Sequence, residues 1–225
     1  LEKLVSKQTQ HLQAVNNELE EKNSELQDFI YHASHDLRGP VSSILGMTQL
    51  INHPLTTSID EIQHYNHMLH NLAVGMDQTI RNLIRSHQLH DHTIQYVDTH
   101  FSGLLEEIRD SLIFRFNDID ITMDYDVKPF KSDPLLLDII IRNLLHNACV
   151  FQDDKNTLKK VKISAVQEDG SLTFIVEDNG IGIPDKLLGY VQKMFVKAST
   201  QNSGSGLGLY LVSTAVKLFK GQLDI

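Results

Sequence analysis

A chain of 225 residues with 41% apolar and 22% charged residues has the composition of a globular protein, with room for one large or two modest domains. Its formal net charge of −9 argues against a nucleic-acid partner, because a surface that binds phosphate backbones needs clustered Lys and Arg. The acidity leaves a nucleotide pocket possible, since such a pocket needs only a few cations and a metal ion.

The chain carries a single cysteine, Cys149, which excludes an internal disulfide and indicates a reducing, cytoplasmic compartment. No apolar run approaches the ~20 residues that cross a bilayer, so we expect no membrane contact within this fragment. The sequence starts at Leu1 inside a helical pattern and stops at Ile225 in what reads as an unfinished strand. We therefore expect a fragment of a longer protein, with any membrane segment upstream.

Residues 1–27 carry apolar positions that repeat every seven residues along a polar, charged helix. The two rows are Val5, Leu12, Leu19 and Leu26, and Gln8, Val15, Lys22 and Phe29. Such a narrow seam is typical of a coiled coil, although polar Gln8 and Lys22 weaken it. The alternative is an amphipathic helix packed inside its own subunit, and we favour pairing between two copies.

Residues 28–90 read as a helical hairpin. Pro40 interrupts the first helix and should bend it beside His35 and Asp36, because proline cannot donate to the carbonyl of residue 36. After a loop at 52–58, Ser58 and Glu61 form a capping box that opens a second helix with the same seven-residue spacing. Two such hairpins make a four-helix bundle, so the spacing predicts a dimeric hairpin domain.

Residues 91–225 mix short strands with helices. The predicted strands are Ile94–Val97, Ile119–Tyr125, Val161–Val166 and Leu172–Val176. The predicted helices are Phe101–Phe114, Pro134–Cys149 and Leu207–Phe219. This part of the chain therefore reads as an α+β domain with helices layered on a sheet.

The segment Ser34–Pro40 contains the pair His35-Asp36 on a helix. A neutral histidine is a competent nucleophile, and an adjacent carboxylate can orient the ring or accept its proton. A His-Asp pair is common, but its place beside a proline and at the edge of the apolar seam favours a chemical role.

Asn143 and Asn147 lie four residues apart on a strongly apolar helix, so both amides project from one face. Buried amides are costly unless they bind something, and Mg²⁺ with its phosphates and waters would satisfy them. The alternative is that they bond neighbouring backbone groups.

Two glycine-rich loops complete the pattern. Glu177–Pro184 follows a strand, where Asp178 could accept the amine of adenine and the glycines allow a flat ligand to approach. Asn202–Leu209 leads into a helix whose amides can receive phosphate oxygens. Its glycine spacing fits neither the Rossmann nor the P-loop pattern, so those two nucleotide sites are excluded.

Five segments in this order resemble the H, N, G1, F and G2 boxes of sensor histidine kinases, and the match covers the chain from about Gln27 to its end. The segments are Ser34–Pro40, Asn143–Ala148, Asp178–Gly182, Met194–Lys197 and Gly204–Leu209. A match to one box would mean little, whereas five in order, each in the expected helix or loop, are specific.

The resemblance implies a dimeric helical hairpin with an N-terminal coiled coil, followed by an ATP-binding α/β sandwich of the Bergerat type that Hsp90, gyrase and MutL share. By this resemblance His35 would accept the γ-phosphoryl group of ATP, with Asp36 as proton acceptor or orienting partner. Asn147 would ligate Mg²⁺, Asn143 would lie near the phosphates, and Asp178 would recognise adenine. The other implied cofactor-binding residues are Gly180, Gly182, Lys197, Gly204, Gly206, Leu207 and Gly208, and residues ~185–205 would form a lid.

The implied function is that of a homodimeric, ATP-dependent protein histidine kinase that autophosphorylates His35 and passes the group to an aspartate of a response-regulator receiver domain. Most of the catalysis would be positioning and charge neutralisation. One alternative is an ATPase with the same pocket, which would have no reason to carry His35-Asp36 on a dimerising hairpin. The other is a nucleotide-binding signalling scaffold with weak or no kinase activity.

Three positions depart from the family pattern. Gly39 stands where a Thr or Asn linked to dephosphorylation of the regulator is frequent, which puts phosphatase activity in doubt. Val150 stands where many members carry a phosphate-binding Lys. Lys197 replaces the usual Arg and keeps the charge without the bidentate fork.

Overall fold

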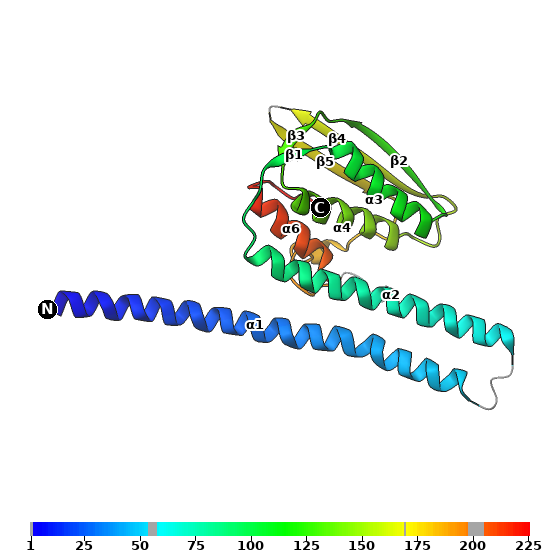
Figure 1. Ribbon diagram of the computed structural model, residues 1–225, viewed down its shortest axis with the longest axis horizontal. Coiled ribbons are helices and arrows are strands. Elements are labelled where there is room, and N and C mark those ends of the chain that lie inside the picture. The colour runs from blue at the N-terminus through cyan, green and yellow to red at the C-terminus, as the bar shows by residue number, and fades with distance from the viewer. Residues whose placement is uncertain (1, 54–57, 169, 198–204) are drawn as a thin grey trace. The chain divides into compact units, whose positions relative to one another are not determined.

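The computed structural model describes residues 2–53, 58–168, 170–197 and 205–225 (Figure 1). The chain forms two compact units, Leu1–Gln78 and Thr79–Ile225. The boundary between them falls inside the second long helix, so that this helix contributes residues to both units.

The first unit is helical. α1 spans Glu2–Ile51 as one continuous helix with Pro40 inside it. α2 spans Ile59–His90 and begins directly after Ser58, whose carbonyl oxygen accepts the Ile62 amide at 3.2 Å. Two acidic residues in the first turn of α2, Asp60 and Glu61, complement the positive end of the helix dipole. The two predicted helices are therefore confirmed, residues 54–57 of the predicted loop lie outside the described residues, and the four-helix bundle stays a prediction.

The second unit contains a three-stranded sheet in the order β2-β4-β5. β2 (Ile119–Asp126) runs parallel to β4 (Lys159–Glu168), and β4 pairs antiparallel with β5 (Ser171–Asp178). A separate two-stranded ribbon joins β1 (Val97–Thr99) to β3 (Phe130–Ser132). A parallel neighbour requires a crossover, which the chain makes through a helix before it enters β4.

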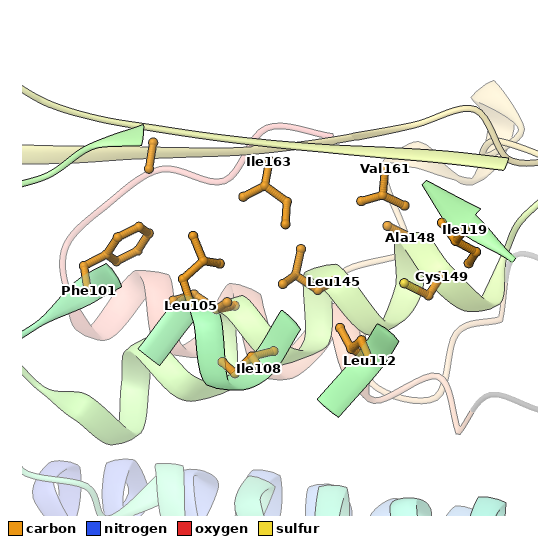
Figure 2. Packing of buried hydrophobic residues seen from close by; sticks show 12 residues of the cluster. Phe101, Leu105, Ile108, Leu112, Ile119, Leu145, Ala148, Cys149, Val161 and Ile163 are labelled. Carbon is orange, nitrogen blue, oxygen red and sulfur yellow. The ribbon is translucent and has the colours of Figure 1, made fainter. Parts of the chain in front are cut away.

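The helices α3 (Phe101–Arg115) and α4 (Pro134–Val150) lie against one face of this sheet (Figure 1). Alternate residues of β4 point into the interface, because side chains of a strand alternate between its two faces. Figure 2 shows Val161 and Ile163 of β4 pointing towards Leu105 and Leu145 of the two helices. The predicted α+β class, with helices layered on a sheet, is confirmed.

A second apolar cluster joins three helices on the other side of α4. It contains Leu89 of α2, Leu136 and Ile139 of α4, and Leu211 and Ala215 of α6, which spans Gly208–Leu218. The last turns of α2, which belong to the second unit, therefore share a hydrophobic core with α4 and α6.

The strand predicted at Ile94–Val97 begins only at Val97. The reason is a side chain upstream of α4: the backbone amide of Gln95 donates to the Asp133 carboxylate at 2.8 Å, which holds this segment outside a sheet ladder. The sequence patterns also missed β3 and the short helix α5 (Asp185–Leu188). Residues 221–225 form no strand.

Replacing Leu89 with Ala should lower the free energy of unfolding by about 2–5 kcal/mol, because the side chain is almost fully buried and its removal leaves a cavity. Urea denaturation of the 225-residue chain measures the loss. The matched control is Ile113→Ala on α3, where the side chain is 43% exposed and the loss should be less than half as large. Equal losses in the two variants would contradict the packing of α2 on the second unit.

Candidate functional site

The asparagines predicted to bind ligand lie on α4, whose start is fixed by its own sequence. Asp133 is the N-cap residue and accepts the amides of Leu135 and Leu136, and Pro134 supplies a preset backbone angle at the first helical position. Asn143 and Asn147 follow on the same helix, about two and a half and three and a half turns further on.

Both amides meet the first residue of α6. A Cβ atom placed on Gly208 would lie 3.4 Å from Oδ1 of Asn143, and 3.5 Å from both amide atoms of Asn147. The amide nitrogen of Asn143, a buried residue, donates to the Ile139 carbonyl oxygen at 2.7 Å. The sequence left open a hydrogen bond from the asparagine side chain to a backbone group, and the structure shows that bond at Asn143. The side-chain oxygen of Asn143, Oδ1, faces Gly208.

The turn after β5 is fixed against the end of α4. Asp178 Oδ1 accepts the Gly180 amide at 2.8 Å, and the Ile181 amide donates to the Phe151 carbonyl oxygen at 3.0 Å. A Cβ atom on Gly180 would collide with that same carbonyl oxygen, so only glycine fits this close approach. Gly182 has a φ of 67°, in the left-handed region that favours glycine.

Asn179 is a structural residue that the sequence patterns missed. Its Oδ1 accepts the Lys160 amide at 2.8 Å, and its Nδ2 donates to the Leu158 carbonyl oxygen at 2.8 Å. Its own carbonyl oxygen accepts from Asn156 Nδ2 at 2.6 Å. These three bonds hold the turn that presents Asp178. The only signal in the sequence is the Asn-Gly pair, which marks a turn without showing what it anchors.

The segment Met194–Lys197 lies against the loop that opens α6. Gly206 has a φ of 66°, and a Cβ atom there would lie 2.9 Å from Phe195 Cα and from the Val196 carbonyl oxygen. The Phe195 amide donates to the Gly206 carbonyl oxygen at 3.0 Å. Leu207, which is fully buried, precedes the helix. Lys197 is exposed.

The structure thus brings Asn143 and Asn147 of α4 next to Gly208 of α6. It also brings Gly206 next to the backbone of Phe195 and Val196. Gly204 and residues 198–204 of the predicted lid lie outside the described residues.

His35 and Asp36 belong to the first unit, away in sequence from these loops. Nδ1 of His35 lies 3.4 Å from Oδ1 of Asp36, and the histidine side chain is 73% exposed while the carboxylate is 14% exposed. An exposed imidazole beside a shielded carboxylate is accessible to an incoming electrophile, and the carboxylate can hold one ring tautomer.

The comparisons with known proteins agree on one family. Residues 132–225 match the family described as "Histidine kinase-, DNA gyrase B-, and HSP90-like ATPase". The methanogenesis regulatory histidine kinase FilI of Methanothrix harundinacea (strain 6Ac) is 25% identical over 211 residues, covering 92% of this chain and 24% of FilI. Residues 132–225 therefore match a GHKL-type ATPase domain, and the curated relatives that align with nearly the whole chain include a protein named as a histidine kinase.

Two solved structures share the fold of this chain. The histidine kinase AdeS of Acinetobacter baumannii matches with a TM-score of 0.61 and 20% identity, covering 82% of this chain and 86% of the AdeS chain. The histidine kinase ThkA, in a complex with the response regulator protein TrrA, matches with a TM-score of 0.54 and 18% identity, covering 79% and 52%.

The chain spans about a third or less of the length of the first curated relatives it matches. Among the helices of the described residues, none combines the length and the apolar character that a membrane span requires.

The chain also carries a partly buried histidine, His146, between the two asparagines of α4, and sequence reasoning gave it no role. Burial, together with the charge of Arg115, lowers the pKa of His146 to about 4. Its ring meets Phe116 edge-on, with 6.3 Å between ring centroids. Cys149 on the same helix is also buried, and burial raises the pKa of its thiol to about 11, which fits packing rather than redox chemistry.

Because His146 stays neutral when folded, stability should be fully present above the unfolded pKa of about 6.5 and be lost as pH falls towards 4. The unfolded imidazole takes up a proton that the folded one refuses, which costs up to about 1.4 kcal/mol per pH unit. Denaturation between pH 7 and 4 should show a steeper decline for wild type than for His146→Phe, which keeps a ring against Phe116. Identical slopes would contradict an imidazole that stays neutral in the folded chain.

Proposed function

We propose that this chain is the catalytic part of an ATP-dependent protein histidine kinase, which autophosphorylates His35 and passes the phosphoryl group to an aspartate of a response regulator. The observation that carries the proposal is the meeting of Asn143 and Asn147 with Gly208 at the start of α6. It joins two separate sequence boxes into one polar site at a helix N-terminus, which suits phosphate binding.

The nucleotide would span the two glycine loops. Asp178 holds its turn with Oδ1 and would offer its second oxygen to the exocyclic amine of adenine. The backbone amides at the start of α6 would receive phosphate oxygens, because the first amides of a helix have no partner inside it. Gly180 and Gly206 allow close backbone approaches at both ends of this path.

The donor set fits Mg²⁺. Magnesium prefers oxygen ligands and keeps several of its waters, so one amide oxygen and the phosphates suffice. We assign that oxygen to Asn147, with Asn143 oriented by its bond to Ile139. When bound, the ion supplies neutralisation of the phosphate charge.

The chemistry at His35 is phosphoryl transfer to a ring nitrogen. A nitrogen–phosphorus bond forms, the bond from the γ-phosphorus to the bridging oxygen breaks, and ADP leaves with that oxygen. The ring proton passes to Asp36 or to water, and the 3.4 Å contact orients the imidazole for this step. The phosphohistidine then gives its group to the receiver aspartate. The crystallised complex of ThkA with TrrA supports a partner of this kind.

A homodimer is the assembly that we propose. Four apolar side chains of the α1 seam, which are 47–68% exposed in the single chain, would be covered by a second copy: Leu12, Val15, Leu19 and Leu26. A row of exposed apolar residues at seven-residue spacing is the pattern that a coiled coil buries.

Replacing Leu12 and Leu19 together with Asp should shift the chain towards monomer, because both charges would be buried in the seam. Analytical ultracentrifugation at micromolar concentration measures the change. The control is Gln13→Asp with Asn17→Asp, which adds the same charge to exposed positions of α1 outside the two rows. A wild-type chain that sediments as a monomer would contradict the assembly.

The second candidate is a nucleotide-binding scaffold with little kinase activity. Val150 favours it, because an apolar side chain at the end of α4 removes one cationic contact to phosphate. Gly39 leaves open space where a side chain linked to dephosphorylation is frequent, so phosphatase activity should be weak.

The deciding experiment is incubation with γ-labelled ATP and Mg²⁺. Wild type should acquire acid-labile, base-stable label, because phosphohistidine has that stability. His35→Gln should acquire none, since the acceptor is gone. Asn147→Asp should lose most of the label, because a carboxylate at this point alters metal binding and repels phosphate.

Asn117→Asp serves as the control for a change of amide to carboxylate on the same unit, because Asn117 is an exposed residue in the turn before β2. Label that survives in His35→Gln would identify a different acceptor. Nucleotide binding without any label would favour the scaffold, and phosphate release without label would favour an ATPase.

A further inference from the structure

The last turns of α2 direct one face at the second unit. Asn82, Ser86 and Leu89 are the buried residues of this helix, and each is less than one-tenth exposed. Their spacing of four and then three residues places them on one side of a helix. Two of the three are polar, which is unusual for a packing face and calls for hydrogen-bond partners.

Two contacts fix the end of α2 against α4 and α6, both in its rotation about the helix axis and in its position along that axis. Leu89 packs among Leu136 and Leu211 of the second apolar cluster. Arg85 donates to Asp138 of α4 at 2.9 Å, and Arg142 donates to the same carboxylate at 2.6 Å. Because an ion pair with this geometry tolerates little displacement, α2 is held at a defined register on α4.

Asn82 reaches the glycine loop directly. Its Nδ2 donates to Oγ of Ser205 at 3.5 Å, across 123 residues of chain. The same Oγ accepts the Leu207 amide at 3.4 Å, one residue before α6 begins. A helix that starts outside the catalytic unit thus holds the residue that precedes Gly206.

The contact with Asn82 decides where the hydroxyl group of Ser205 can point its hydrogen. A serine oxygen has two lone pairs and one hydrogen. Asn82 and Leu207 occupy the lone pairs, so the remaining hydrogen of Ser205 is left to donate. Phosphate oxygens are the acceptors expected at a helix N-terminus.

We propose that Asn82 is a positioning residue of the nucleotide site, which orients the Ser205 hydroxyl so that it donates to a phosphate oxygen of the bound nucleotide. The inference rests on the proposed function, because it takes the loop at the start of α6 to be the phosphate site.

The test is a double-mutant cycle on the dissociation constant of a non-hydrolysable ATP analogue, measured by calorimetry on the 225-residue chain with Mg²⁺. Asn82→Ala and Ser205→Ala should each weaken binding about fivefold, the size of one hydrogen bond. The double variant should bind no worse than Ser205→Ala alone, because both changes remove the same donation.

An isosteric variant separates orientation from packing. In Asn82→Asp the amide donor becomes a carboxylate, which would accept a hydrogen bond from the Ser205 hydroxyl and repel phosphate. Binding should weaken more than in Asn82→Ala, although the side chain keeps its shape. The matched control is Ser86→Ala, which removes a buried hydroxyl one turn further along the same face and should bind like wild type.

A wild-type chain that binds no nucleotide would overturn the proposed function and this inference with it. If wild type binds, the inference alone fails when Asn82→Ala binds within twofold of wild type, or when the two single effects add in the double variant. Denaturation midpoints of all variants show whether a loss of binding comes from a loss of folding. If Asn82→Ala is destabilised, the cycle is repeated with Asn82→Asp in its place, together with Ser205→Ala.

Discussion

The buried carboxylate of Asp133 holds the catalytic unit together at the point where three segments meet. One oxygen accepts the Leu135 and Leu136 amides, which start α4, and the other accepts His92 Nε2 at 2.7 Å and the Gln95 amide. Burial opposes its charge, but these hydrogen bonds prevail and hold the pKa of Asp133 below its usual value. The helix that carries both site asparagines is therefore tied to the segment that follows α2.

From that point the site depends on how closely backbone segments approach one another. Gly180 lies against the Phe151 carbonyl, Gly206 against the Phe195 backbone, and Gly208 against the amides of Asn143 and Asn147. Side chains larger than hydrogen at the first two positions would push the loops away from α4 and α6. The glycine boxes therefore serve packing, because the absence of a Cβ atom lets neighbouring backbone segments approach closely at Gly180 and Gly206.

The sequence predicted most elements because their patterns are local. Apolar alternation located β2, β4 and β5, and the Ser58 and Glu61 signal located the start of α2. It could not predict which surface covers the end of α2. A seven-residue repeat gives the spacing of a buried stripe without its partner, and Leu89, to which the sequence patterns gave no role, packs with α4 and α6. Long-range polar contacts such as Arg85 to Asp138 leave no local pattern at all.

α2 is a continuous helix that runs from the first unit into the second, where its end contacts the loop before α6. Residues 59–78 of this helix belong to the first unit and residues 79–90 to the second, with no break in its hydrogen bonding between them. Rotation about the helix axis would move Asn82, Arg85 and Leu89 together, since they share one face. The hydrogen bond from Asn82 to Ser205, at 3.5 Å, is longer and therefore weaker than the charged bond from Arg85 to Asp138 at 2.9 Å, so Asp138 supplies the firmer attachment of this helix end.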